Sequence, residues 1–289
     1  MKKYEIMVSK NAGFCMGVKR AFTKSIVLSK KYDNLFTYGD LIHNRFALDE
    51  LYKNNIKSIK DIDEILTDNK KNIIIRAHGV SLKEEEIIKK NRNLFDLTCP
   101  IVKNVQKLAE RLTREQLFIL IYGKDKHPEI IGIKGYCENN NLVFENINEL
   151  DNLDNKKLKD KKLALISQTT MNNIKFEDIA LKLKERYQNI YIYNTLCKHP
   201  IKNQEKSLEL AKNSDIMVIV GDKNSSNTKT LYDKIAAVSK TIFAETDEDL
   251  IEFLEDLKKS KKIGVTAGSS TPISQIEKIE RAIKIILDN

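Results

Sequence analysis

Several residue types are scarce in this sequence of 289 residues, which has no tryptophan, four cysteines and four prolines. No run of about 18 apolar residues occurs, which excludes a predicted membrane-spanning helix. The N-terminal stretch Met1–Val8 has two lysines but only a short apolar run interrupted by Glu5. We predict that it forms a first β-strand and not a signal peptide. The sequence therefore favours a cytoplasmic protein whose thiols are kept reduced.

Positive charge is in excess, with a formal net charge of +9, but it is spread along the whole chain. Most lysines are interleaved with Asp and Glu, as on the solvated faces of helices. Tryptophan is absent, and no aromatic-rich basic strand is present to serve as a nucleic-acid platform. We therefore expect no binding of nucleic acid, and the charge suits an anionic small substrate or an acidic electron-donor protein.

Short apolar runs rich in β-branched residues alternate with longer amphipathic stretches. This alternation predicts an α/β fold with parallel sheets. The clearest predicted strands are 73–75, 117–121, 163–166 and 216–220, and the clearest predicted helices are 102–114, 176–186 and 203–212.

Polar residues follow the predicted strands at their C-terminal ends. Ligands of open parallel sheets bind beyond those ends, so we expect one composite site built from several loops. The loops are Arg76–Gly79, Tyr122–Glu129, Ser167–Thr170, Gly221–Asn227 and Thr266–Ser270.

Three of the four cysteines, Cys15, Cys99 and Cys197, recur at similar intervals, each after a plausible strand. This repetition predicts three α/β units that each contribute one thiolate to a shared centre. The predicted units span residues 14–97, 98–193 and 194–289, with the strand in residues 1–13 packing against the third.

The alternative for these cysteines is that they are buried structural thiols, which behave as small hydrophobic residues. Three thiolates would suit a four-iron cluster with one iron left open, because full ligation takes four cysteines. Zinc would be expected with closer ligand spacing. Cys137 fits no repeat, and we interpret it as a bystander.

Three of the four histidines, His43, His78 and His127, lie in predicted strand-end loops. Histidine in such a place can donate to phosphate oxygens or carry a proton near neutral pH, and a structural role is the alternative. His199 repeats a Lys-His-Pro triplet, and we interpret it as a coincidence.

The stretch Asn224–Asn227 offers hydroxyls, amides and backbone N–H groups before a predicted helix. It can be a phosphate cradle or a plain helix cap, and the pair Ser269–Ser270 before Pro272 has the same two interpretations. Glu129 could donate a proton, provided that burial raises its pKa.

A series of short motifs runs in order along nearly the whole chain. The motifs are Gly13–Val18, His43–Arg45, Ala77–Val80, Thr98–Pro100, His127–Glu129 followed by Gly132, Ser167–Thr170, Lys223–Asn227 and Thr266–Pro272. Together they resemble the 4-hydroxy-3-methylbut-2-enyl diphosphate reductase family, also called the LytB type. Members of this family catalyse the last step of the non-mevalonate isoprenoid pathway.

The resemblance implies three α/β units arranged as a trefoil around a central [4Fe–4S] cluster. Cys15, Cys99 and Cys197 match the cluster ligands of the family, which leaves one open iron for the substrate's 4-hydroxyl. Loss of that iron in air would leave [3Fe–4S]. The residues that match the family's diphosphate contacts are His43, His78, Ser225, Ser226, Asn227 and Ser270.

The resemblance also implies the roles of the remaining site residues. Glu129 matches the catalytic acid, Thr169 matches a threonine that binds the hydroxyl and relays protons, and His127 matches a histidine that contacts the substrate. The implied reaction is reductive dehydroxylation to isopentenyl and dimethylallyl diphosphate. Ferredoxin or flavodoxin would be the electron donor, and we expect a monomer.

Two assignments are ambiguous by one residue, Ser269 against Ser270 and Thr169 against Thr170. Asp222 stands where some relatives have a small residue, and we expect its side chain to point outward. Three other functions stay open: an iron–sulfur redox carrier or sensor without turnover, a phosphosugar-binding domain, and a zinc hydrolase that uses His43, His78 and His127.

Overall fold

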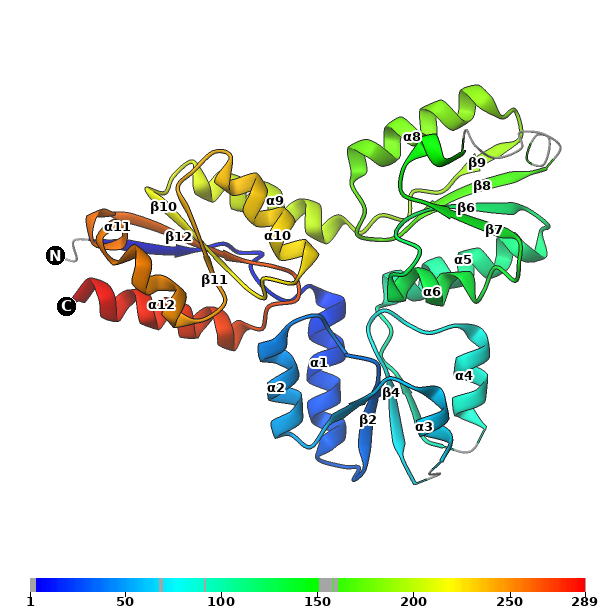
Figure 1. Ribbon diagram of the computed structural model, residues 1–289, viewed down its shortest axis with the longest axis horizontal. Helices are drawn as coiled ribbons and strands as arrows, with labels where there is room; N and C mark the ends of the chain where they lie inside the picture. The colour runs from blue at the N-terminus through cyan, green and yellow to red at the C-terminus, as the bar shows by residue number, and fades with distance from the viewer. Residues whose placement is uncertain (1–3, 68–69, 91, 151–157, 159–160, 289) are drawn as a thin grey trace. The chain divides into compact units, whose positions relative to one another are not determined.

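The computed structural model describes residues 4–67, 70–90, 92–150, 158 and 161–288. They form three four-stranded parallel sheets with helices between the strands (Figure 1). The predicted α/β fold with parallel sheets is therefore confirmed. Within this part of the chain, no helix combines the length and apolar character needed to cross a membrane.

The first sheet has the strand order β3-β2-β4-β5. Its strands are β2 (Leu35–Tyr38), β3 (Lys57–Ile59), β4 (Asn72–Ile75) and β5 (Leu94–Asp96). The helices in this part of the chain are α1 (Met16–Ser29), α2 (Arg45–Lys53), α3 (Ile62–Leu66) and α4 (Leu82–Lys89).

The second sheet has the order β7-β6-β8-β9. Its strands are β6 (Phe118–Tyr122), β7 (Asn141–Phe144), β8 (Leu163–Ser167) and β9 (Ile190–Ile192). The accompanying helices are α5 (Pro100–Arg114), α6 (Pro128–Lys134), the 3-10 helix η1 (Ile147–Leu150) and α8 (Asn173–Arg186).

The third sheet has the order β1-β12-β10-β11, so the first strand of the chain pairs in parallel with the last. Its strands are β1 (Glu5–Val8), β10 (Ile216–Val220), β11 (Thr241–Ala244) and β12 (Lys262–Ala267). The accompanying helices are α9 (Lys198–Ala211), α10 (Ser226–Ala236), the 3-10 helix η2 (Asp247–Phe253), α11 (Leu254–Lys259) and α12 (Ile273–Asp288).

The central strands read as continuous apolar runs because both faces of each sheet are covered. Every residue of β8 and β10 is buried. The core of the third sheet includes Val218, Val265 and Ile279, and Ile121 and Leu165 belong to two apolar clusters of the second sheet.

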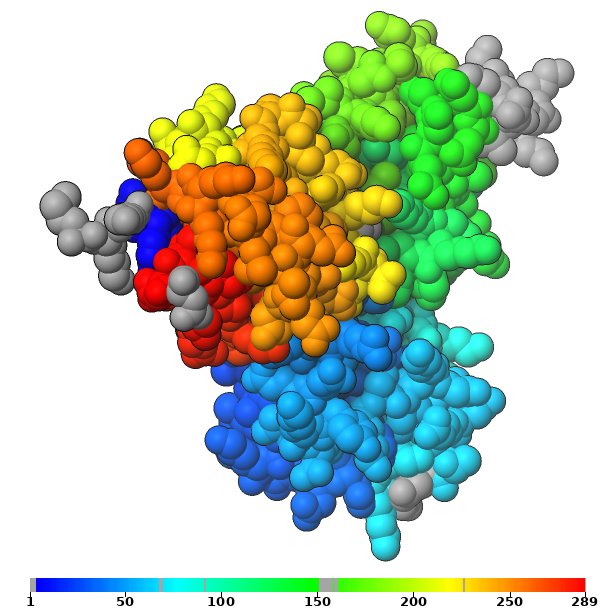
Figure 2. Space-filling model, turned by 60° about the vertical axis from the view of Figure 1, so that its left-hand side comes forward, coloured from blue at the N-terminus to red at the C-terminus, as the bar shows by residue number. Residues whose placement is uncertain are grey.

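Contacts along the chain group it into two compact units. The terminal unit comprises Met1–Ser29, Ile42–Lys57 and Lys198–Asn289, and the central unit comprises Lys30–Leu41 and Ser58–Cys197. In the terminal unit the two ends of the described chain meet, since the Tyr4 hydroxyl donates to Asp288 Oδ1 at 2.6 Å (Figure 2). The division into domains 14–97, 98–193 and 194–289 stays a prediction.

The three sheets share one connectivity. We number the strands of each sheet in chain order and count β1 as the last strand of the third sheet. The order across every sheet is then second, first, third, fourth. Each of Cys99, Cys197 and Cys15 follows the fourth strand of one sheet, β5, β9 and β1 respectively. A glycine directly follows the first strand of each sheet, at Gly39, Gly123 and Gly221. Residues far apart in the sequence therefore take equivalent places in the three sheets.

Candidate active site

In the central unit, a buried carboxylate lies between two loops that follow the strands of the second sheet. Glu129 is 2% exposed, and its Oε1 accepts the backbone N–H of Thr169 at 2.6 Å. Its Oε2 accepts the Thr169 hydroxyl at 2.8 Å. The two loops are therefore joined through one carboxylic acid and one threonine.

Burial strongly disfavours the ionised form of Glu129 and raises its pKa to about 7. The two hydrogen bonds from Thr169 act in the opposite direction, because they stabilise the carboxylate. A carboxyl group with a pKa near neutrality is suited to proton transfer.

Thr169 and Thr170 differ in the contacts that their side chains make. The Thr170 hydroxyl accepts a hydrogen bond from Gln168 Nε2 at 2.8 Å. Thr169 is buried and faces Glu129, and its carbonyl accepts the N–H of Cys197 at 2.7 Å. Of the two threonines, Thr169 is the one placed beside the acid.

His127 is the N-cap of α6, and its Nδ1 accepts the N–H of Glu129 at 3.2 Å. The His78 ring lies edge-on to His127, with centroids 5.5 Å apart and an interplanar angle of 86°. The structure thus groups two of the predicted histidines near the buried acid.

The loop of His78 depends on a glycine. Gly79 has φ +75°, and a Cβ there would lie 2.4 Å from Gln106 Nε2. Its N–H closes a turn onto the Arg76 carbonyl at 3.0 Å. A side chain at position 79 would be strained and would displace the buried Gln106, so the glycine sets the course of this loop.

Cys15, Cys99 and Cys197 each stand directly before the N-terminus of a helix, α1, α5 and α9 respectively. All three are partly exposed, and Cys15 Sγ accepts the N–H of Val18 at 3.5 Å. Thiolate sulfur is a ligand that iron accepts, so the chemistry of each of these side chains is compatible with iron.

The same backbone contact recurs at each of these cysteines. The cysteine N–H donates to a carbonyl two residues beyond the end of the third strand of its sheet. The pairs are Cys15 with Ser269 at 3.2 Å, Cys99 with Ala77 at 2.9 Å and Cys197 with Thr169 at 2.7 Å.

Cys137 differs from the other three cysteines in its burial. It is fully buried in an apolar cluster of the second sheet, and its thiol donates to the Ile133 carbonyl at 3.3 Å. Burial raises its pKa to about 12, which keeps the thiol protonated. A protonated, enclosed thiol does not suit metal ligation.

In the terminal unit, the predicted serine loops lie against each other. Ser225 is the N-cap of α10, and its Oγ lies 3.2 Å from Ser270 Oγ. Ser269 Oγ instead lies 3.4 Å from His199 Nδ1. Asn227 follows in the first turn of α10, and the side chain of Ser226 lies outside the described part of the structure. Ser270 is thus the serine of the pair that faces Ser225.

His43 is exposed and directly precedes Asn44, the buried N-cap of α2. Asp222 approaches the same helix start, since its Oδ2 accepts the N–H of Arg45 at 2.9 Å. The expectation that Asp222 points outward is wrong, because its side chain caps backbone donors and the residue is only 8% exposed.

One polar contact set was missed by the sequence reasoning. Ser207 Oγ lies 2.7 Å from Thr266 Oγ1, and Asn203 Nδ2 donates to the Ala267 carbonyl at 3.0 Å. His199, Asn203 and Ser207 lie four residues apart on α9. Their side chains face β12 and the loop that follows it. His199 therefore has a packing partner in this loop, and the polar residues at helical spacing were the signal in the sequence.

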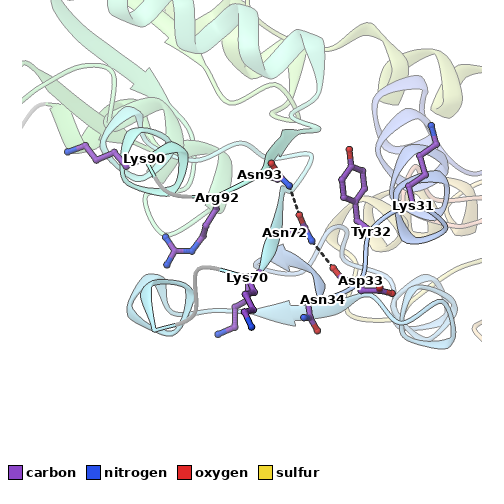
Figure 3. Close-up of a pocket in the computed structure, with 10 residues that line it drawn as sticks. Lys31, Tyr32, Asp33, Asn34, Lys70, Asn72, Lys90, Arg92 and Asn93 are labelled. Carbon is purple, nitrogen blue, oxygen red and sulfur yellow. Dashed lines mark hydrogen bonds between the residues drawn. The ribbon is translucent and has the colours of Figure 1, made fainter.

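A shallow hollow of about 640 Å³ lies elsewhere in the central unit, at the amino ends of β2, β4 and β5 (Figure 3). Asn93 donates to Asn72, which donates to the Asp33 carbonyl across its floor. The basic side chains at its rim, such as Lys31 and Lys90, splay outward in Figure 3. It lies at the opposite end of the first sheet's strands from the loop of His78, which follows β4.

The fold and these loops define an α/β protein of three parallel sheets, with polar, thiol and acidic groups beyond the carboxyl ends of the strands. The model of the family described as LytB protein matches residues 6–284. The chain belongs to this family, which confirms the resemblance noted in the sequence. The family generally depends on iron–sulfur chemistry.

Two relatives of similar length have the same enzyme name. The chain is 40% identical over 286 residues to the 4-hydroxy-3-methylbut-2-enyl diphosphate reductase of Campylobacter hominis, covering 96% of this chain and 98% of that protein. It is 39% identical over 284 residues to the reductase of the same name from Helicobacter pylori strain P12, covering 98% of this chain and all of the relative.

Two solved structures are similar over most of their length. One is an (E)-4-hydroxy-3-methyl-but-2-enyl diphosphate reductase described as the terminal enzyme of the non-mevalonate pathway, with a TM-score of 0.79, 30% identity and coverage of 97% of this chain and 99% of that one. The other is the E-1-hydroxy-2-methyl-but-2-enyl-4-diphosphate reductase from Plasmodium falciparum, with a TM-score of 0.82, 26% identity and coverage of 96% and 87%.

Proposed function

We propose that this protein reduces 4-hydroxy-3-methylbut-2-enyl diphosphate to isopentenyl and dimethylallyl diphosphate, the last step of the non-mevalonate isoprenoid pathway. The reaction breaks the C–O bond at carbon 4 and forms a C–H bond. It consumes two electrons and two protons and releases water. Membership of the LytB family and the name shared by the relatives support this activity. The contact between Glu129 and Thr169 carries the chemical part of the proposal.

In this proposal Cys15, Cys99 and Cys197 hold a [4Fe–4S] cluster with one iron that has no protein ligand. Their positions before helix N-termini support this choice over the enclosed Cys137. When bound, the cluster supplies single electrons and a Lewis acid for the hydroxyl. Ferredoxin or flavodoxin as donor, a cytoplasmic location and a monomeric state stay predictions from the sequence.

The diphosphate is held by hydroxyl, amide and imidazole donors in this proposal. Ser225 and Ser270 form a hydroxyl pair at the start of α10, where backbone N–H groups and the helix dipole favour an anion. The other proposed contacts are His43, His78, Ser226 and Asn227. Such contacts fix the substrate's reacting end and replace part of the entropic barrier.

Glu129 and Thr169 deliver the proton to the departing hydroxyl. When protonated, Glu129 donates from Oε2 to Thr169 Oγ1 across the 2.8 Å contact. The threonine hydroxyl can then donate its own proton to the substrate oxygen. The protonated hydroxyl would leave as water when the two electrons of the reduction are supplied. In this proposal His127 contacts the substrate, and its Nδ1 accepts the N–H of Glu129 at 3.2 Å, which fixes the ring beside the acid.

Product analysis in D2O tests the proposal. Cluster-loaded protein, reduced viologen and substrate are incubated anaerobically, and the products are identified by mass spectrometry. We expect both isoprenoid diphosphates, each with one deuterium on carbon. A loaded cluster that accepts electrons but leaves the substrate unchanged would favour the redox-carrier alternative.

A further inference from the structure

We infer that Asp222 is a positioning residue for the substrate's diphosphate, because it ties the start of α2, beside His43, to the loop Gly221–Ser225. The inference rests on the proposed function. His43 and Ser225 are both proposed diphosphate contacts, and both belong to the terminal unit. No motif in the sequence links these two segments, so the tie is visible only in the structure.

Asp222 makes three hydrogen bonds that shape both segments. Its Oδ1 accepts the N–H of Asn224 at 2.7 Å, and its carbonyl accepts the N–H of Ser225 at 3.0 Å. These two contacts close the loop onto itself. Its Oδ2 accepts the N–H of Arg45, the first residue of α2, at 2.9 Å. One carboxylate therefore fixes the loop and reaches the helix.

The start of α2 is held from a second side. Asn44 Oδ1 accepts the N–H of Ala47 at 2.9 Å, and Asn44 Nδ2 donates to Gln275 Oε1 at 3.1 Å. Gln275 in turn donates to the Glu245 carbonyl at 2.8 Å. Together with the contact from Asp222, this series of hydrogen bonds fixes the start of α2 in two directions. His43 is the residue directly before Asn44.

A carboxylate suits this place for a physical reason. Both donors that meet its oxygens are backbone N–H groups, and Arg45 N–H lies at the positive end of a helix. Asparagine would keep one acceptor but turn an NH2 group toward a donor. Serine could still cap the loop, but it is too short to reach both donors. Only the acid satisfies both contacts.

The Ser225 backbone is also constrained by this arrangement. Its N–H donates to the Asp222 carbonyl, and its hydroxyl lies 3.2 Å from that of Ser270. Loss of the tie would loosen the distance between His43 and the hydroxyl pair. Diphosphate binding should weaken while the acid at Glu129, in the other unit, keeps its contacts.

Matched variants test the tie. Asp222→Asn removes one acceptor, and Arg45→Pro removes the backbone donor at a helix position that accepts proline. Arg45→Ala keeps the backbone N–H and serves as the control. We measure the Kd of inorganic diphosphate by calorimetry, and KM and kcat for the substrate with cluster-loaded protein.

We expect Kd and KM to rise about tenfold in Asp222→Asn and Arg45→Pro, the size expected for one hydrogen bond to a charged group. In the same variants kcat should change less than KM, and Arg45→Ala should resemble the wild type. Unchanged Kd and KM in both Asp222→Asn and Asp222→Ser would overturn the inference. If Asp222→Asn does not fold, the Kd and KM of Asp222→Ser test the inference in its place.

The two proposals can fail separately. If the wild type does not convert the substrate, the proposed function fails, whatever the variants show. If the wild type turns over and the Asp222 variants bind diphosphate normally, only the positioning role fails.

Discussion

Glu129 accepts two hydrogen bonds from the single residue Thr169, one at 2.6 Å from its N–H and one at 2.8 Å from its hydroxyl. A glutamine can preserve both contacts, because its oxygen accepts the N–H and its amide donates to the hydroxyl. Glu129→Gln should therefore keep the fold and the cluster spectrum. Turnover should fall by about 10²–10⁴-fold, the range for loss of a general acid.

Glu86→Gln, at an exposed position on α4, is the matched control and should stay within about twofold of wild type. Circular dichroism and cluster absorbance check the fold of both variants. Substantial turnover by Glu129→Gln would refute the proton-donor role.

Turnover should depend on pH through Glu129. Because burial raises the pKa of this acid to about 7, the protonated form that donates is abundant below pH 7 and scarce above it. We expect kcat to fall as the pH rises through about 7. A kcat that is constant from pH 6 to pH 9, measured with saturating substrate and a chemical reductant, contradicts this assignment.

Thr169 and Thr170 should differ sharply when their hydroxyls are removed. Thr169→Val deletes the hydroxyl of the relay and should lower kcat about 10- to 100-fold. It also removes a donor that lowers the pKa of Glu129, so the falling limb of the pH profile should move to higher pH. Thr170→Val, whose hydroxyl bonds to Gln168, is the control and should keep most activity.

The buried Glu129 should also make the free energy of unfolding depend on pH. Its pKa is raised in the folded protein above the ordinary value of 4.5, so the native state binds more protons than the unfolded state between these two values. The free energy of unfolding should fall by about 3 kcal/mol as the pH rises from 4.5 to 7, from this group alone. Glu129→Gln should remove that component, measured by urea unfolding of the cluster-free protein across this range.

The candidates for this site could be named from local sequence. Strand-end loops are short-range features, so Glu129 and the three cysteines proposed as ligands could be singled out with their neighbours. The contact between Asp222 and Arg45 joins residues 177 apart in sequence, and no local pattern encodes it. The same is true of His199, whose partner Ser269 lies 70 residues away. Side-chain direction, as in Thr169 against Thr170, also required the folded loops.

The cysteines should divide into two groups when replaced. Serine at Cys15, Cys99 or Cys197 should abolish stable iron and sulfide binding, since each proposed ligand stands alone on its loop. Cys137→Ala should keep full iron content and lose about 1–2 kcal/mol of stability from its buried position. Metal analysis after anaerobic reconstitution distinguishes the groups, and full iron in a Cys99→Ser variant would count against the proposed ligand set.

The measurement that tests the central claim most directly is anaerobic oxidation of reduced viologen by cluster-loaded wild-type protein, before and after adding 4-hydroxy-3-methylbut-2-enyl diphosphate. Glu129→Gln, loaded to the same iron content, is run beside it as the blank. The account predicts rapid oxidation by the wild type only when substrate is present, and little with the variant. No substrate-dependent oxidation by the loaded wild type, or equal rates for both proteins, would contradict it.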